Sequence, residues 1–150
     1  MKLLLMISII ITAFGVSIIG WTWYPQENPD QPETLPLVTI MQQLLDDIQK
    51  VDHGIYTENF TMIEEGAGNI SDHPTMTMED KKLVKTTLGD DIKQFVKFDK
   101  TVHHHADSMR IAAIEEDMQN VLKHYRITQQ GCVDCHSKYR KKISAAREDN

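Results

Sequence analysis

The two cysteines of this 150-residue chain lie three positions apart near its C-terminal end, and a histidine follows directly, in the stretch "GCVDCH" at 131–136. Two thiols at positions i and i+3 share one face of a helix, where each can add to a vinyl group of a porphyrin. The adjoining imidazole can then bind the iron as an axial ligand. The C-x-x-C-H spacing therefore predicts one covalently attached haem c, held by Cys132 and Cys135 and ligated by His136.

Three other uses of such a cysteine pair compete with haem attachment. A thiol–disulfide oxidoreductase carries C-x-x-C at a helix start beside a βαβ pattern, and no strand pattern is visible in this sequence. A structural zinc site needs two further ligands, for which the run His103-His104-His105 is the nearest source. A disulfide across i and i+3 is strained within a helix. Haem attachment accounts for the histidine as well as for both thiols.

The overall composition is that of a globular protein rather than a disordered one, with 41% hydrophobic and 25% charged residues. A net charge of −6 argues against nucleic acid as a partner. No side chains are arranged in the sequence as a nucleophile with a general base, so we expect no enzymatic activity of that kind.

The N-terminal residues predict export from the cytoplasm. Lys2 is followed by an uncharged stretch that continues to Gly20, which is typical of a secretory signal peptide or an uncleaved membrane anchor. The aromatic residues Trp21, Trp23 and Tyr24 favour the anchor, because aromatic side chains gather at membrane interfaces. Either reading places the protein in the periplasm, anchored to the inner membrane if the segment is retained, which suits haem attachment outside the cytoplasm.

The remaining chain divides into a tether and one domain. Residues 21–35 are largely polar and rich in proline, which predicts an extended tether. Residues 36–150 carry amphipathic stretches with helical spacing at 37–55, 60–70, 88–113 and 118–143, with the third break near 114–117. The fold prediction is all-α, an antiparallel four-helix bundle with a C-terminal haem attachment site. In the first stretch the expected buried stripe consists of Val38, Met41, Leu45, Ile48, Val51 and Ile55.

The sequence "CVDCHSKYRKKI" inside a last helix resembles the cytochrome c′ type, the class II c-type cytochromes. That family has a C-x-x-C-H-x-x-aromatic-Arg pattern, which Cys132, Cys135, His136, Tyr139 and Arg140 match. The resemblance implies that Arg140 pairs with a haem propionate and that Tyr139 packs against the porphyrin edge. Members of the family often pair through their first two helices, so a homodimer is a further implication.

The resemblance also implies that the first helix faces the iron, with either a methionine ligand or an apolar side chain. His136 lies about ten residues before the expected end of the last helix, or roughly 15 Å. A side chain at matching depth must lie within about ten residues of the start of the first helix, and Met41 fits. Leu44 and Leu45 would line the same pocket. The alternative for Met41 is a core position without ligation.

These inferences predict a monohaem cytochrome that carries single electrons between periplasmic or membrane redox partner proteins. The alternative is a five-coordinate haem protein that binds nitric oxide or carbon monoxide. A haem-free, membrane-tethered interaction module is a third class. The histidine run is expected to place His105 at the core edge and to leave His103 and His104 facing water, without a metal.

Overall fold

The computed structural model describes residues 33–148, which are almost entirely helical. The helices are α1 (Leu37–Tyr56), α2 (Phe60–Ser71), α3 (Met78–Leu88), α4 (Ile92–Ile114), α5 (Met118–Cys135) and α6 (Lys141–Glu148). A short 3-10 turn (Gly89–Asp91) precedes α4, and a π-helical turn (His136–Arg140) joins α5 to α6. Two short strands, β1 (Thr34–Leu35) and β2 (Thr75–Met76), pair in parallel.

The prediction of an all-α fold built on long helices is confirmed for the described residues, apart from the two-residue strands. Helices α1 and α2 begin at the predicted residues, and the break between α4 and α5 falls within the predicted range. Glu116 enters the left-handed region there (φ 55°), and the Asp117 carboxylate caps α5 by accepting a hydrogen bond from the backbone of Asn120 at 3.1 Å. Helix α3 was not predicted, because its few apolar residues form only a short stripe.

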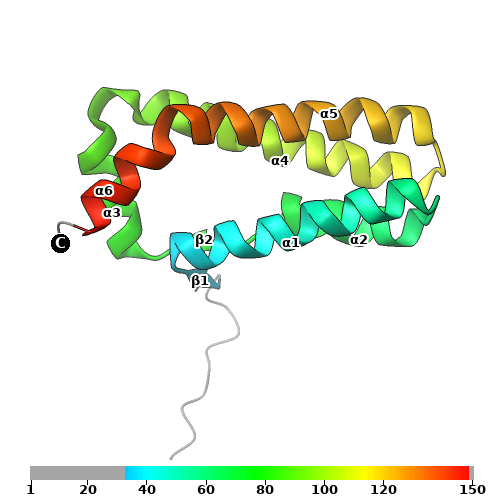
Figure 1. The fold of residues 1–150 in the computed structure, drawn as a ribbon, viewed down its shortest axis with the longest axis horizontal. Helices are drawn as coiled ribbons and strands as arrows, with labels where there is room; N and C mark the ends of the chain where they lie inside the picture. Colours follow the sequence, from blue (N-terminus) through cyan, green and yellow to red (C-terminus); the bar gives the residue numbers. More distant parts are fainter. Residues whose placement is uncertain (1–32, 149–150) are drawn as a thin grey trace, which may run out of the picture. The chain divides into compact units, whose positions relative to one another are not determined.

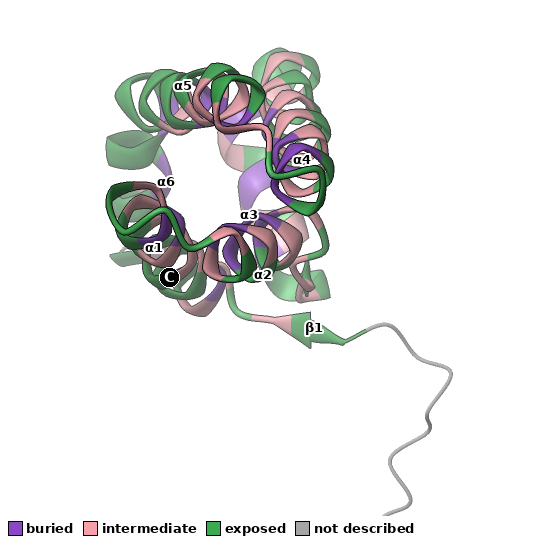
Figure 2. Cartoon of the chain, turned by 90° about the vertical axis from the view of Figure 1, so that its right-hand side faces the viewer, coloured by how far each residue is buried: buried purple, intermediate pink, exposed green. Residues whose placement is uncertain are grey.

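The four long helices pack in the order α1, α2, α4, α5, each against the next, as the end-on view of Figure 2 shows. Helices α1 and α5, the first and last of this series, make only sparse backbone contact with each other. The sequence colours of Figure 1 show that α1 and α5 run in opposite directions along the length of the molecule. The packing therefore has three closed seams and one loosely closed seam.

Two glycines explain why α1 and α2 approach closely. A Cβ atom added at Gly54 would lie 2.8 Å from the Ile63 side chain, and one added at Gly66 would lie 2.8 Å from both Val51 and the Asp47 carbonyl. Real side chains do not reach such distances, so both positions need glycine for this helix spacing. Ile63 and Val51 are fully buried in the seam that results.

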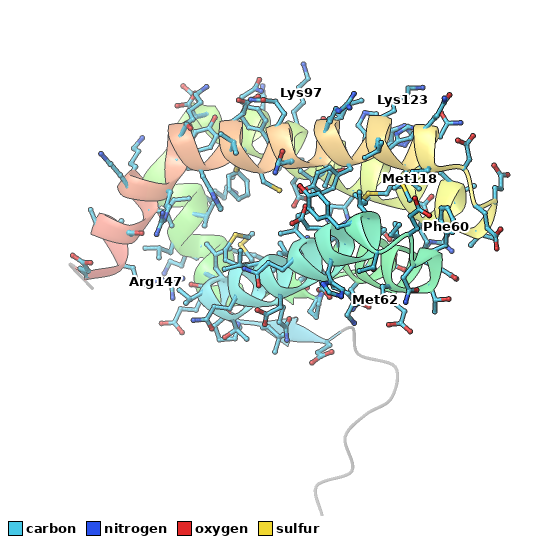
Figure 3. All side chains as sticks on the ribbon, turned by 45° about the vertical axis from the view of Figure 1, so that its right-hand side comes forward. Phe60, Met62, Lys97, Met118, Lys123 and Arg147 are labelled. Atoms are coloured by element: carbon cyan, nitrogen blue, oxygen red, sulfur yellow. The ribbon has the colours of Figure 1, made fainter. Side chains whose placement is uncertain are left out.

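Helices α3 and α6 close one end of the molecule and are tied to the start of α1. The buried Asp80 carboxylate accepts a hydrogen bond from the Leu37 backbone at 2.6 Å and pairs with Arg147 of α6 at 2.5 Å. Arg147 is labelled at that end in Figure 3. This carboxylate fixes where α1 begins and where the C-terminal helix ends.

The hydrophobic core consists of two clusters along the length of the molecule. The larger lies among α1, α2, α4 and α5, around Val51, Ile63 and Met109. The smaller lies among α3, the start of α4 and α6, around Val84, Leu88 and Tyr139.

No helix within residues 33–148 is both long enough and apolar enough to cross a membrane. The predicted signal peptide or anchor at 1–20, and all but the end of the predicted tether at 21–35, lie outside the described residues. Strand β1 begins two residues before the predicted domain boundary at residue 36.

Candidate haem-binding site

The two cysteines lie at the C-terminal end of α5, between the two hydrophobic clusters. Both are half-buried, and Cys132 packs against the larger cluster while Cys135 packs against the smaller one. The residue before them is Gly131, where an added Cβ atom would lie 3.0 Å from the Val102 side chain of α4. Close packing of α5 on α4 at this point therefore fixes the depth of the thiols.

Burial governs the acidity of both thiols. It raises the pKa of Cys132, and burial together with the charges of the nearby thiol and of Asp99 raises the pKa of Cys135 to about 11. Thiol–disulfide oxidoreductases lower the pKa of the attacking cysteine, often at the N-terminal end of a helix. The position at a helix C-terminus and the raised pKa values both disfavour that chemistry here.

A π-helical turn begins at His136, directly after the second cysteine. The side chain of His136 is exposed, whereas that of Tyr139 within the same turn is buried. Insertion of a π turn changes the direction of the side chains that follow it, and such turns are frequent at functional sites. Within this turn Tyr139 is buried in the core, while His136 remains accessible.

Tyr139, for which a contact with the haem edge is predicted, lies in the smaller hydrophobic cluster, against which Cys135 also packs. Only 2% of the residue is exposed, and its ring packs edge-on against Phe95 and Phe98, with ring centroids 5.9 and 6.2 Å apart. Its hydroxyl donates a hydrogen bond to the Asp91 carbonyl at 3.4 Å. The residue is enclosed by protein, so its role here is to anchor the π turn to α4.

Arg140 is exposed, and none of the ion pairs found within residues 33–148 includes it.

The first helix differs from the predicted burial pattern in an informative way. Val51 is buried and Ile48 and Ile55 pack against the core as predicted, but Val38, Met41 and Leu45 are 48%, 37% and 54% exposed. The residues buried at this end of α1 are instead Ile40 and, partly, Leu37 and Leu44. The three uncovered side chains lie at spacings of three and four, so they form one apolar stripe, named here the α1 stripe.

One hydrogen bond shows what the α1 stripe faces. The Tyr125 hydroxyl of α5 donates to the Asp52 carboxylate of α1 at 3.1 Å. At about 100° per residue, Met41 and Leu45 each lie within about 20° of Asp52 around the axis of α1. By the same rotation, Cys132 and His136 each lie within about 20° of Tyr125 around the axis of α5. The α1 stripe and the haem motif therefore face each other across the loosely closed seam.

The same hydrogen bond also fixes the depth of these residues along the two helices. Met41 lies 11 residues before Asp52, and His136 lies 11 residues after Tyr125. Since α1 and α5 run in opposite directions, Met41 and His136 lie at the same depth, about 16 Å from the hydrogen bond. Leu45 and Cys132, each seven residues away, match in the same manner.

Within the histidine run 103–105, two of the three residues lie as predicted and His103 does not. His104 is exposed as predicted, and His105 is half-buried at the core edge as predicted. The expectation that His103 faces water was wrong: it contacts Asp99 at 3.6 Å and the ring of His73, with centroids 4.4 Å apart. The Asp99 carboxylate raises the pKa of His103.

A second histidine pair links α4 to α5. The Nδ1 atoms of His105 and His124 are 2.9 Å apart, so one ring donates and the other accepts. Burial, and then the neighbouring positive groups, lower the pKa of both histidines.

Asp99 and His73 are functional candidates that the sequence did not reveal. The i,i+4 spacing of Asp99 and His103 on one helix was the available signal, whereas the approach of His73 depends on the tertiary fold.

In comparisons with known proteins, no family model, no curated protein and no solved structure matches this chain.

Proposed function

We propose that this protein is an exported monohaem c-type cytochrome of the cytochrome c′ type, folded as an antiparallel four-helix bundle, which carries single electrons between periplasmic or membrane redox partners. The observation that carries the proposal is the register across the seam between α1 and α5. It brings the C-x-x-C-H motif opposite an apolar stripe that residues 33–148 leave partly exposed.

Three properties of the seam support a bound porphyrin. Its walls carry large apolar side chains that are left partly exposed, which is unfavourable unless another apolar surface covers them. The thiols are half-buried between two hydrophobic clusters, where a flat apolar group would contact both. The sparse contact between α1 and α5 leaves these side chains free to pack on a ligand.

In this proposal each residue of the chain has a distinct task. Cys132 and Cys135 would hold the porphyrin through thioether bonds, and His136 would bind the iron from α5. Met41 would supply a second ligand from α1, and Leu45 would exclude water beside it. Arg140, exposed one turn after the histidine, pairs with a propionate at the rim.

Haem supplies one-electron chemistry, in which iron changes oxidation state without bonds being made or broken in a substrate. The chain sets the reduction potential through the identity of its axial ligands and through burial. Ligation by Met41 as well as His136 would raise that potential, and the apolar neighbours of Met41 would keep water away from the iron.

The end of the molecule near the motif also suits a redox partner. Four exposed basic side chains follow the attachment site, although the chain as a whole carries a net charge of −6. They are Lys138, Arg140, Lys141 and Lys142. A local positive patch on an acidic protein steers an acidic partner toward that end, where the haem edge would lie. Helix-terminal lysines also complement the helix dipole, so this feature supports the proposal without carrying it.

The alternative function, binding of nitric oxide or carbon monoxide at a five-coordinate iron, differs in the role of Met41 alone. Leu45 and Val38 lie on the same stripe and would line an apolar pocket for a diatomic gas. The two functions therefore share the fold and the attachment site, and they differ in whether the Met41 side chain binds the iron.

Optical spectra of the oxidised and reduced protein, made in a host that attaches haem, test the assignment. We expect a low-spin spectrum that becomes high-spin in Met41→Ala, together with a lower reduction potential. Met78→Ala is the matched control, because Met78 is 77% exposed on α3 and lies outside the seam between α1 and α5, and its spectrum should equal that of the wild type. The alternative would be supported by a wild-type spectrum that is high-spin, that is the same in Met41→Ala, and that changes on addition of nitric oxide.

A further inference from the structure

Away from the seam, three metal-ligating side chains meet at the junction of α4 and the connection between α2 and β2. Asp99 and His103 lie one turn apart on α4, and His73 lies between α2 and β2. The Asp99 Oδ1 atom is 3.6 Å from His103 Nε2 and 3.9 Å from His73 Nε2. One ligand atom from each of the three residues lies within 4.8 Å of the other two.

In both histidines the Nδ1 atom is hydrogen-bonded to a backbone carbonyl oxygen. His73 Nδ1 lies 2.8 Å from the Pro74 carbonyl oxygen, and His103 Nδ1 is hydrogen-bonded to the Ser71 carbonyl. Because a carbonyl only accepts, each ring donates through Nδ1. In a neutral ring the lone pair is therefore on Nε2, and both Nε2 atoms are turned toward Asp99. A backbone carbonyl behind a ligating histidine is the usual support in metal sites, where it fixes tautomer and orientation.

The spacing of these atoms suits a small divalent ion. Zinc–nitrogen and zinc–oxygen bonds of about 2.0–2.2 Å at tetrahedral angles separate neighbouring ligands by about 3.4 Å. The two measured distances to the carboxylate exceed this value by only a few tenths of an ångström. The three ligand atoms lie within 4.8 Å of one another, so rotations of the Asp99 side chain, which is 48% exposed, and of the imidazole rings are needed to bring them to bonding distance of one ion. The exposure of Asp99 leaves an open side for a water ligand.

The surroundings favour a cation as well. His73 lies on the wall of an open groove of about 680 Å³ over α1 and α2. The groove is lined by six carboxylates and one guanidinium, that of Arg110; the carboxylates belong to Glu33, Asp46, Asp47, Glu64, Glu65 and Asp72. A concave acidic surface raises the local concentration of cations beside the two imidazoles.

We propose that His73, Asp99 and His103 form a binding site for a divalent transition-metal ion, with zinc as the ion tested. Two imidazoles and one carboxylate suit zinc, cobalt, nickel or copper better than the oxygen-preferring magnesium and calcium. The bound ion fastens the connection between α2 and β2 to the middle of α4. This site is separate from the proposed haem site, and it stands whether or not haem is attached.

Without a metal, the same three residues would form a hydrogen-bonded cluster in which a proton links His103 to Asp99. The two explanations differ in what zinc does. A proton-linked cluster gains nothing from the ion, whereas a metal site binds it with a fixed stoichiometry and resists thermal unfolding more strongly in its presence.

Calorimetric titration of the full chain with ZnCl₂, on protein that carries no polyhistidine tag, tests the site. We expect one equivalent of zinc to bind to the wild type, with an accompanying rise in Tm. His73→Ala, His103→Ala and Asp99→Asn should each lower the affinity at least about tenfold. His103→Gln, which keeps the size of the side chain, serves as a second variant if His103→Ala fails to fold.

Two control variants separate this site from the other histidines. His104→Ala changes the exposed neighbour in the same run, and His124→Ala breaks the pair between α4 and α5. Both should bind zinc as the wild type does. The proposal is overturned if the wild type binds no zinc, if the three ligand variants bind it unchanged, or if binding disappears in His124→Ala instead.

Discussion

The two flanks of α1 differ in how they meet their neighbours. Toward α2 the backbones approach so closely that Gly54 and Gly66 leave no room for a Cβ atom, and Val51 and Ile63 are fully buried between them. Toward α5 the contact is sparse, and a single side-chain hydrogen bond, from Tyr125 to Asp52, links the two helices among the described residues.

The composition of the two flanks does not explain this difference. Both are apolar, and the α1 stripe of Val38, Met41 and Leu45 is as hydrophobic as the side chains buried against α2. The difference lies in whether protein covers them. The flank toward α2 stabilises the fold, whereas the flank toward α5 is left partly exposed by the described residues 33–148, and in the proposed function a haem covers it. Energetic measurements on matched residues of the two flanks can therefore test the proposed function.

The largest effect is expected at the closed seam. Ile63→Ala removes a fully buried side chain that packs beside Gly54, and it should lower the free energy of unfolding by about 2–5 kcal/mol. Leu45→Ala on the opposite flank should cost less than about 0.5 kcal/mol in haem-free protein, because 54% of that residue is already exposed. The haem-free background for this measurement is the double variant Cys132→Ser/Cys135→Ser. Adding Ile63→Ala or Leu45→Ala to it and unfolding each protein with denaturant gives the free-energy cost of each change.

A second, smaller effect should appear once haem is attached. A porphyrin in the seam would bury Leu45, so Leu45→Ala should then cost about 1–2 kcal/mol, while the cost of Ile63→Ala stays the same. Unfolding of the haem-loaded protein supplies the comparison. An equal cost of Leu45→Ala with and without haem would mean that no ligand covers the α1 stripe.

The smallest effect concerns the link between the two helices. Tyr125→Phe removes the hydrogen bond to Asp52 and should cost about 1 kcal/mol at neutral pH. The same change should alter the response to alkali. Burial and then the Asp52 carboxylate raise the pKa of Tyr125 to about 12, so the folded state holds this proton more tightly than the unfolded state.

The stability that this tyrosine contributes is therefore complete below its unfolded pKa, near 10. It is lost as pH rises from about 10 to about 12, since only the unfolded state releases the proton over most of that range. Urea unfolding at several alkaline pH values should show a shallower decline in Tyr125→Phe than in the wild type. Parallel declines would show that this hydroxyl is not held across the seam.

The sequence alone was sufficient for the parts of the structure that depend on local periodicity. It predicted the start of α1, the extent of α2 and the turn before Met118, because apolar spacing is a signal that acts over a few residues. It also singled out Cys132, Cys135 and His136, since their chemistry follows from spacing alone.

Tertiary contacts decided what the sequence could not. Helical spacing over 118–143 is enough to predict a buried Tyr139, but its contacts with Phe95 and Phe98 and the π turn that contains it depend on the tertiary fold. His103 meets His73 across a separation of 30 residues, which no local pattern records. The predicted burial of Met41 and Leu45 assumed that every apolar stripe is covered by another helix, and α5 does not cover this one.

Mass spectrometry of the denatured full chain, made in a bacterial host that attaches haem, tests the central claim most directly. The peptide that contains Cys132 and Cys135 should carry the added mass of one haem through two thioether bonds, and Cys132→Ser/Cys135→Ser should carry none. A colourless wild-type protein, whose peptide contains two free thiols or one disulfide, would contradict the account.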